Sequence, residues 1–381
     1  MSLLTRISVP APPAPEAEDI FSSALTTIFT DDAINSWGSP GAHITYRSPR
    51  FGPLTLQIPV HPDEEQGRTL FAHYLWNAGV VAADAIEEAS AGGQGEPTSI
   101  DQHDDDPERI VWDKRYWSVR GKRTLEIGAA TALPSLIAAL VDALSVTITD
   151  HPSSPALTND AIVHNVRENL YLHPAFESIP PHNPQPRTAA CESILVYGYT
   201  WGTSTFYQPA EYGKPASPPL ASDLPPATSV TEKGYPRPDK IIVADCLWMP
   251  SQHVNILRTI LHFLPQGISK DTDEMNSVPC ALVVAGFHTG RAIVRNFFDL
   301  AVGHSMSSPH SDDIDEQRPQ PQPYSHLTAE ERACVGKLRL ARIFEMDMDK
   351  RRRDWVWASE RKGEGKWEAK RWCVVGVLVR R

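Results

Sequence analysis

Residues 124–135 read Thr-Leu-Glu-Ile-Gly-Ala-Ala-Thr-Ala-Leu-Pro-Ser, an apolar strand-like run that passes through small residues into a predicted helix. Pro134 supports a helix start there, because proline is favoured in the first turn of a helix. The small side chains let backbone N–H groups and the helix N-terminus approach a ligand closely. Asp150 closes the next predicted strand, where nucleotide-binding α/β domains place an acid that hydrogen-bonds a ribose diol. This order predicts a ribose-bearing cofactor.

The loop also separates two cofactor classes. A dinucleotide requires the pattern G-x-G-x-x-G to seat its pyrophosphate, whereas this loop has Gly128 and no later glycine. S-adenosylmethionine carries no pyrophosphate, so a loop of small residues suits its methionine part. Such a loop can also mark a point where a strand and a helix pack closely, so the loop alone does not establish a cofactor.

An alternation of strands and helices begins at this stretch and continues toward the C-terminus. Such alternation is typical of a doubly wound, mostly parallel sheet with right-handed crossovers. The last two strands are joined by a charged excursion without a helical pattern, which favours an antiparallel hairpin at the C-terminal edge. We therefore predict an α/β fold, a Rossmann-like sheet of seven strands in the layout of the methyltransferases. The seven predicted strands are 124–127, 145–149, 194–197, 240–244, 280–287, 338–345 and 372–379.

The rest of the chain is predicted to be arranged around this sheet. Residues 1–18 are rich in proline and are predicted to form a flexible tail. Residues 19–100 are predicted to form an N-terminal extension, with a β-hairpin over 43–58 and a helix over 70–88. Residues 101–381 are predicted to form the methyltransferase domain. Proline-rich or serine-rich insertions interrupt this domain and are predicted to be disordered surface: about 173–190, 202–237 and 304–324.

Composition excludes several classes of protein. The net charge of -11 argues against general nucleic-acid binding, which needs a basic surface to displace counterions. The five cysteines are scattered without a CxxC pair, which argues against a zinc site and a disulfide framework. The N-terminus has no apolar signal segment, and no apolar run reaches the roughly 18 residues of a membrane span. We expect a soluble, metal-free monomer in the cytoplasm, or alternatively in the nucleus.

The charge is unevenly distributed along the chain. Residues 350–381 carry eleven basic and four acidic side chains, so the rest of the chain has a net charge of about -18. Within this segment the run Lys350-Arg351-Arg352-Arg353 is interpreted as a solvated loop. A contact surface for an acidic partner is the alternative.

Five blocks of sequence together resemble the nicotinamide N-methyltransferase-like family of seven-strand methyltransferases. The resemblance extends in order from about residue 70 to the end of the chain. Within the family, the fungal protein N-terminal and lysine methyltransferases that act on elongation factor 1-alpha are the most similar. The blocks are Phe-Ala-His-Tyr-Leu-Trp-Asn-Ala-Gly at 71–79, the loop at 125–135, Thr-Asp-His-Pro at 149–152, Gly-Tyr-Thr-Trp-Gly at 198–202 and Ala-Asp-Cys-Leu-Trp at 244–248.

The resemblance implies contacts with S-adenosylmethionine. Trp76 corresponds to the aromatic residue that covers the methionine end of the cofactor, and Trp201 corresponds to the residue that packs near the adenine. Asp150 matches the acid that binds the ribose. For both tryptophans, ordinary core packing is the alternative. The other residues that the resemblance implies to contact the cofactor are small: Gly128, Ala129 and Ala130 beneath it and Ala244 beside its sulfonium.

The segment after the fourth strand departs from the family pattern. The lysine methyltransferases carry D-L-L-F-N-H-S-E-H, whereas residues 245–253 read D-C-L-W-M-P-S-Q-H. This segment lies on the side from which the methyl acceptor arrives. A carboxylate at Asp245 and an aromatic ring at Trp248 could hold an ammonium group, with a cation–π contribution. Asp245 could instead cap the following helix.

Three functions remain open from the sequence. The first is an N-methyltransferase that acts on a protein lysine or N-terminal amine, with a translation factor as the implied partner. The second is a small-molecule N-methyltransferase for a nicotinamide-like acceptor. The third is a module that binds the cofactor with little catalytic activity, because the acceptor segment has diverged.

Overall fold

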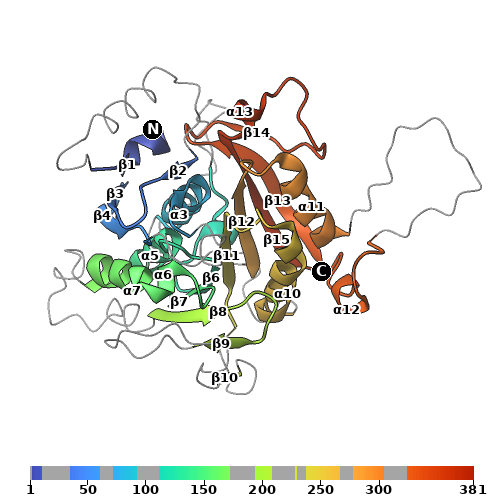
Figure 1. Cartoon of the computed structure of the whole chain (residues 1–381), viewed down its shortest axis with the longest axis horizontal. Helices are drawn as coiled ribbons and strands as arrows, with labels where there is room; N and C mark the ends of the chain where they lie inside the picture. The colour runs from blue at the N-terminus through green and yellow to red at the C-terminus, as the bar shows by residue number, and fades with distance from the viewer. Residues whose placement is uncertain are drawn as a thin grey trace, which may run out of the picture.

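A central sheet with helices on both faces forms the body of the protein in the computed structural model (Figure 1). The predicted insertion at 173–190, and most of those at 202–237 and 304–324, lie outside the residues that the structure describes. The described residues are 2–10, 35–60, 72–91, 111–171, 194–207, 228–229, 237–266, 278–303 and 324–381.

All seven predicted strands are present and pair within this sheet. They are β6 (Arg123–Ile127), β7 (Ser145–Asp150), β8 (Ile194–Tyr199), β11 (Lys240–Ala244), β12 (Cys280–Gly286), β13 (Leu338–Asp347) and β15 (Trp372–Arg380). Their spatial order is β8-β7-β6-β11-β12-β15-β13. The pairs from β8 to β12 are parallel. Since β15 lies antiparallel between β12 and β13, the predicted Rossmann-like sheet and its C-terminal antiparallel hairpin are confirmed.

Three short strands extend the sheet beyond the seven predicted ones. They are β9 (Thr205–Tyr207), β10 (Thr228–Ser229) and β14 (Arg352–Asp354). Two of them, β9 and β10, fall within the insertion at 202–237, so the prediction of disordered surface is wrong for those residues. Strands of two or three residues are too short for an alternating pattern to show in the sequence. Packing fixes β9, because the buried ring of Phe206 stacks between Tyr197 and Phe263.

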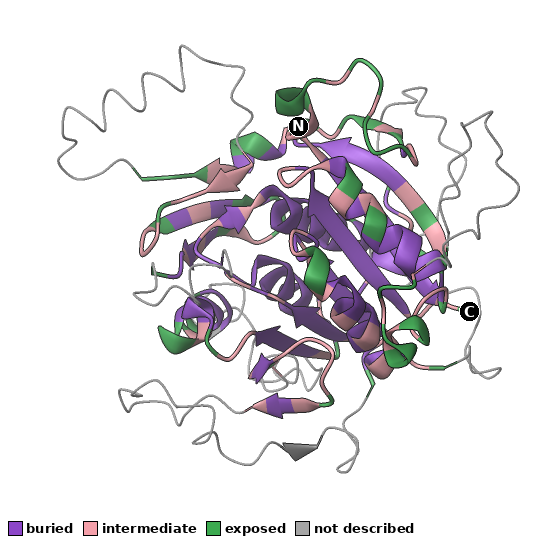
Figure 2. Ribbon diagram, turned by 45° about the vertical axis from the view of Figure 1, so that its right-hand side comes forward, coloured by how far each residue is buried: buried purple, intermediate pink, exposed green. Residues whose placement is uncertain are grey.

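Two layers of helices cover the sheet (Figures 1 and 2). Strand alternation separates two cores, since Ile242 packs with α3 and α5 whereas Ile241 and Val243 pack with α10 and α11. No helix in the described ranges is long and apolar enough to cross a membrane. The first layer contains α3 (Asn77–Ala89), α4 (Lys114–Trp117), α5 (Leu133–Leu140), α6 (Pro155–Thr158), α7 (Ala161–Val166) and η2 (Arg167–Tyr171). The second contains α10 (His253–Phe263) and α11 (Arg291–Val302). Further short helical elements in the described residues are η3 (Pro250–Gln252), α12 (Ala329–Arg332) and α13 (Lys366–Ala369).

The N-terminal extension shares the first core. Its hairpin consists of β3 (His43–Ser48) and β4 (Gly52–Gln57), as predicted, and β2 (Ser36–Trp37) pairs with β5 (Leu75–Trp76). Alternate hairpin residues such as Ile44 and Leu56 are fully buried against this core.

The first residues of the chain correct the predicted tail. They form η1 (Leu3–Arg6) and β1 (Ile7–Ser8), and β1 pairs with β3. Leu3 is fully buried, and its N–H donates to the Met348 carbonyl at 2.7 Å. The Arg6 guanidinium lies 2.6 Å from the buried carboxylate of Asp84 on α3. A flexible tail is therefore wrong for residues 2–10, because a buried leucine and a buried ion pair fix them.

The basic run at 350–353 is a solvated loop only in part, because Arg351 and Arg352 are exposed whereas Lys350 and Arg353 are half-buried beside acidic partners. Lys350 Nζ lies 2.7 Å from an Asp84 carboxylate oxygen and 2.9 Å from one of Glu88. Arg352 and Arg353 belong to the short strand β14, which pairs with β13. Arg353 donates to Glu345 at 2.7 Å and lies over the ring of Trp372. These acidic partners come from the chain itself.

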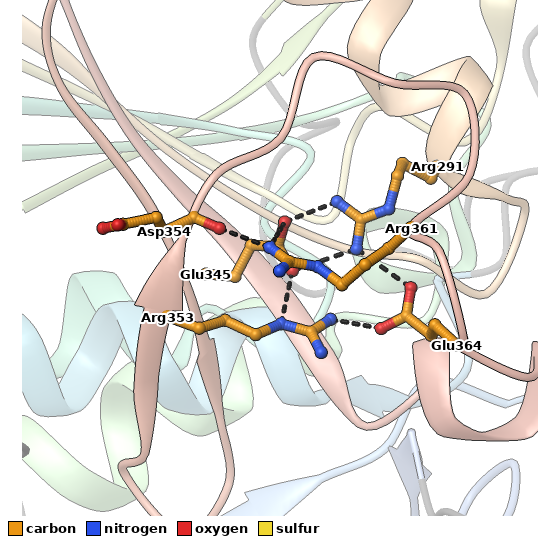
Figure 3. A network of polar contacts seen from close by, with 6 residues as sticks. All are labelled: Arg291, Glu345, Arg353, Asp354, Arg361 and Glu364. Carbon is orange, nitrogen blue, oxygen red and sulfur yellow. Dashed lines mark hydrogen bonds and ion pairs between the residues drawn. The ribbon is translucent and has the colours of Figure 1, made fainter.

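Glu345 is the centre of a buried ion network (Figure 3). Its carboxylate accepts hydrogen bonds from Arg291 at 2.9 Å, Arg353 at 2.7 Å and Arg361 at 3.2 Å. Glu364 pairs with Arg291 and with Arg353. Although burial opposes ionisation, the Arg291 and Arg353 guanidiniums hold the pKa of the Glu345 carboxyl below its usual value. The network ties α11 and β14 to β13.

Candidate functional site

A cavity of about 190 Å³ opens at the carboxyl ends of the central strands. The chain proceeds from β6 through β7 to β8 on one side and continues with β11 on the other, so the strand order reverses between β6 and β11. Open α/β sheets bind ligands at such a switch point. Every site residue predicted from the sequence lines this cavity: Trp76, Gly128, Ala129, Ala130, Asp150, Trp201, Ala244, Asp245 and Trp248.

The loop after β6 brings backbone against the cavity. Gly128 has a φ of +64°, and a Cβ at this position would lie 2.8 Å from Cys246 Sγ and 3.1 Å from a ring carbon of Trp201. Only glycine fits there, because it combines the left-handed conformation with the absence of a side chain. Ala130 also has a positive φ, of 49°. The loop therefore packs closely against its neighbours, which was its alternative role, and it also lines the cavity.

Asp150 ends β7 with its carboxylate in the cavity wall and is only 5% exposed. One oxygen accepts the N–H of Ala130 at 2.8 Å, and the other accepts the N–H of His151 at 2.7 Å. Burial raises the pKa of the Asp150 carboxyl, and these two backbone donors act in the opposite direction. Each carboxylate oxygen can accept a further hydrogen bond. The group can therefore receive the two hydroxyls of a diol while it holds the loop.

Glu126 is a cavity residue that the sequence analysis missed. It lies in β6, and its carboxylate accepts the N–H of Ser135 in the first turn of α5 at 3.1 Å. Burial raises the pKa of the Glu126 carboxyl to about 8, opposed by the hydrogen bonds from Ser135. An acidic residue in the middle of a buried strand was the available signal, because such a side chain needs a specific partner.

The raised pKa of Glu126 predicts a measurable pH dependence of stability. In the unfolded chain this carboxyl titrates near 4.5, and in the folded protein near 8. A pKa raised by folding stabilises the protein at low pH, and this contribution is lost as the pH rises from 4.5 to 8. We expect Glu126→Gln to flatten that decline, at about 1.4 kcal/mol per pH unit. Urea unfolding of both proteins at pH 5, 7 and 9 measures the difference; equal slopes would show that Glu126 is ionised when folded.

Two tryptophans form parts of the wall. Trp76 ends β5, and its ring stacks on His288 with centroids 4.6 Å apart and meets Tyr74 edge-on at 5.8 Å. Trp201 follows β8 and lies against Gly128. Both tryptophan rings are partly exposed and line the cavity, so neither is an ordinary core residue.

Asp245, predicted to lie on the acceptor side, has a left-handed backbone, at a φ of +57°. Its Oδ1 accepts the N–H of Gly286 at 3.1 Å, and the residue is 8% exposed. The helix-capping alternative is wrong, because α10 begins at His253 and Gln252 occupies the capping position. His253 itself is fully buried, with Nε2 2.9 Å from the Leu247 carbonyl oxygen, and so has a structural role.

Further residues of the wall were not predicted from sequence. Most come from the five sequence blocks or directly follow them, so their position along the chain was the available signal. They include Ala72, Tyr74, Leu75, Gly79, Thr131, Pro134, His151, Tyr199, Thr200, Cys246, Met249 and Gln252.

Comparisons with known proteins relate the chain to one group. No protein-family model matches it. The crystal structure of SMU.776 complexed with SAH covers 95% of this chain and 65% of that one, with a TM-score of 0.41 and 8% identity, a likeness too weak to support an argument.

Curated fungal proteins named protein N-terminal and lysine N-methyltransferase EFM7 match more clearly. The protein from Gibberella zeae is 28% identical over 55% of this chain and 56% of its own length. The protein from Aspergillus fumigatus is 28% identical over 61% of this chain and 63% of its own length. The protein from Schizosaccharomyces pombe is 34% identical over 39% of this chain and 42% of its own length. The chain thus matches about half the length of these relatives. The names do not bear on the nicotinamide N-methyltransferase-like label. As its motifs predict, the chain is a sequence relative of the fungal protein N-terminal and lysine N-methyltransferases.

Proposed function

We propose that this chain is an S-adenosylmethionine-dependent N-methyltransferase that acts on a protein lysine or N-terminal amine. The observation that carries the proposal is the convergence of a ribose-type acid, a small-residue loop, two tryptophans and a second buried acid on one cavity. The names of the fungal relatives support the acceptor class. We also propose that its protein partner is a translation factor and that the enzyme is a monomer in the cytoplasm.

The residues of the cavity wall suit the cofactor in their size and in their hydrogen-bonding groups. Gly128 leaves space that a Cβ would fill, and Asp150 presents acceptors suited to a ribose diol. Trp76 and Trp201 offer aromatic faces, and Ala129, Ala130 and Ala244 contribute small side chains to the same wall. When bound, the cofactor supplies an electrophilic methyl group on a sulfonium.

The chain's own residues would align the reactants and exclude water. The Asp245 carboxylate and the Trp248 ring border the cavity where an acceptor would enter. There they would hold the ammonium of an arriving amine, through charge and through a cation–π contact. The amine must release a proton to solvent before its nitrogen lone pair can accept a methyl group, so Asp245 would orient it through that step.

A labelling experiment tests the class of acceptor. The protein is incubated with methyl-labelled S-adenosylmethionine and a fungal cell extract, and label is followed in the protein and low-mass fractions. We expect label in protein. Label confined to low-mass material would replace the protein acceptor with a small molecule, and cofactor binding without any transfer would indicate a binding module.

A second experiment tests the cofactor site. We expect Asp150→Ala to weaken binding of S-adenosylmethionine by about 1–3 kcal/mol, because the ribose hydroxyls lose charge-assisted hydrogen bonds. Isothermal calorimetry measures the affinity. Asp354→Ala is the matched control, since Asp354 is exposed and does not line the cavity. Unchanged affinity in Asp150→Ala would remove Asp150 from the site, and preferential binding of NAD would overturn the cofactor.

A further inference from the structure

His288 lies beside two residues of the cavity wall, Trp76 and Asp245. It follows β12 in the turn that leads to α11. Its ring stacks on Trp76, with centroids 4.6 Å apart and planes 20° apart. Its Nδ1 lies 3.8 Å from Asp245 Oδ1, within ion-pair range and too long for a hydrogen bond. One imidazole therefore contacts both a cavity tryptophan and the acceptor-side acid.

The polar atom of this histidine faces the acid without another partner. Nδ1 is buried and forms no hydrogen bond within the described residues. Buried nitrogen atoms are seldom left in this state, since an unmade hydrogen bond of a buried polar atom is destabilising. Catalytic hydrogen bonds are often long before substrate binds and shorten in the complex. The arrangement leaves Nδ1 available to donate to Asp245 when an acceptor arrives.

Gly286 keeps the space in which this pair forms. A Cβ at Gly286 would lie 3.0 Å from His288 Nδ1 and 3.8 Å from Asp245 Oδ1. The same glycine donates its N–H to Asp245 Oδ1 at 3.1 Å. Since Gly286 lies in a β-strand, its backbone does not require glycine. The absence of a side chain instead serves the approach of His288 to Asp245.

We propose that His288 is a positioning residue that keeps Asp245 ionised and aimed at the incoming ammonium. The proposal rests on the proposed methyltransferase function. Burial raises the pKa of the Asp245 carboxyl, and His288 and the Gly286 N–H lower it. Within the described residues, the buried thiols of Cys246 and Cys373 also interact electrostatically with Asp245. Burial raises the pKa of both well above the usual value, so they stay neutral.

Two substitutions separate charge from stacking. His288→Phe keeps a ring to stack on Trp76 and removes both nitrogens, whereas His288→Asn keeps an N–H donor near the position of Nδ1. We expect His288→Phe to lower kcat/KM for the acceptor 10- to 100-fold and to move the acidic limb of the pH–rate profile to higher pH, because Asp245 then needs a higher pH to ionise. His288→Asn should recover part of the activity, and cofactor affinity should stay within about twofold in His288→Phe, which keeps the stacking on Trp76. Wild-type activity and pH profile in His288→Phe would overturn the proposal.

A direct titration keeps the test independent of methyl transfer. The Asp245 carboxyl is followed by carbon-13 NMR in protein labelled at aspartate, with Asp245→Asn to assign the signal. We expect a higher pKa for Asp245 in His288→Phe and in Gly286→Ala than in wild type. Gly365→Ala, where a Cβ meets no atom within 4 Å, is the matched control and should change nothing. If the pKa of Asp245 is the same in His288→Phe as in wild type, the role of His288 is overturned. If the pKa shifts as expected but the wild-type protein transfers no label, only the proposed function is overturned.

Discussion

Replacing Glu345 by alanine is expected to lower the free energy of unfolding by about 3–5 kcal/mol. The Glu345 side chain is fully buried and accepts hydrogen bonds from three arginines. Among the described residues, its loss leaves the Arg291 guanidinium, 3% exposed, with the carboxylate of Glu364 as its one remaining acidic partner. An uncompensated buried charge is costly, because it cannot recover its hydration. Urea unfolding at pH 7 measures the change.

Two comparisons show whether the network explains the loss. Glu360→Ala is the control, since this glutamate lies in the same excursion and is exposed. The double variant Arg291→Met with Glu345→Leu should be less destabilised than Glu345→Ala, because it removes both buried charges and keeps apolar volume. A loss below about 1 kcal/mol in Glu345→Ala would mean that the arginines regain water, and the network would then be a surface feature in energetic terms.

The sheet was predictable because its strands are buried on both faces and therefore appear as apolar runs. Strand β12, from Cys280 to Gly286, is buried at every residue and is of this kind. The anchoring of the N-terminus was not predictable. Leu3 and Arg6 are fixed by Met348 and Asp84, which are distant in sequence, and no local pattern encodes those partners. The ion pairs of the run at 350–353 were not predictable for the same reason, because they involve residues distant in sequence such as Glu88.

The site was predicted in part for a similar reason. Gly128, Asp150 and Asp245 each follow or end a parallel strand, and the carboxyl ends of such strands meet at one edge of the sheet. His288 follows β12 in the same way, so its position carried the same signal, without a sequence block to draw attention to it. Its contact with Trp76 could not be inferred, because the two residues lie in different elements far apart in the chain.

Asp245→Asn is expected to lower methyl transfer to an amine acceptor by about a hundredfold or more, with cofactor affinity within about twofold of wild type. The substitution removes the charge that holds the ammonium and changes little else. Asparagine tolerates the left-handed backbone at this position, and its carbonyl oxygen can still accept the Gly286 N–H. Single-turnover labelling on the acceptor identified in extract gives the rate, and calorimetry gives the cofactor affinity.

Trp248→Ala provides the comparison for Asp245→Asn. It removes an aromatic wall without a change of charge, so it should raise the KM for the acceptor more than it lowers kcat, because such a wall stabilises ground state and transition state alike. Equal loss of cofactor and acceptor binding in both variants would show that the segment is structural. Full activity of both on that acceptor would place the acceptor pocket elsewhere. The expected pair, a kcat effect at Asp245 and a KM effect at Trp248, occurs only if the segment contacts the acceptor.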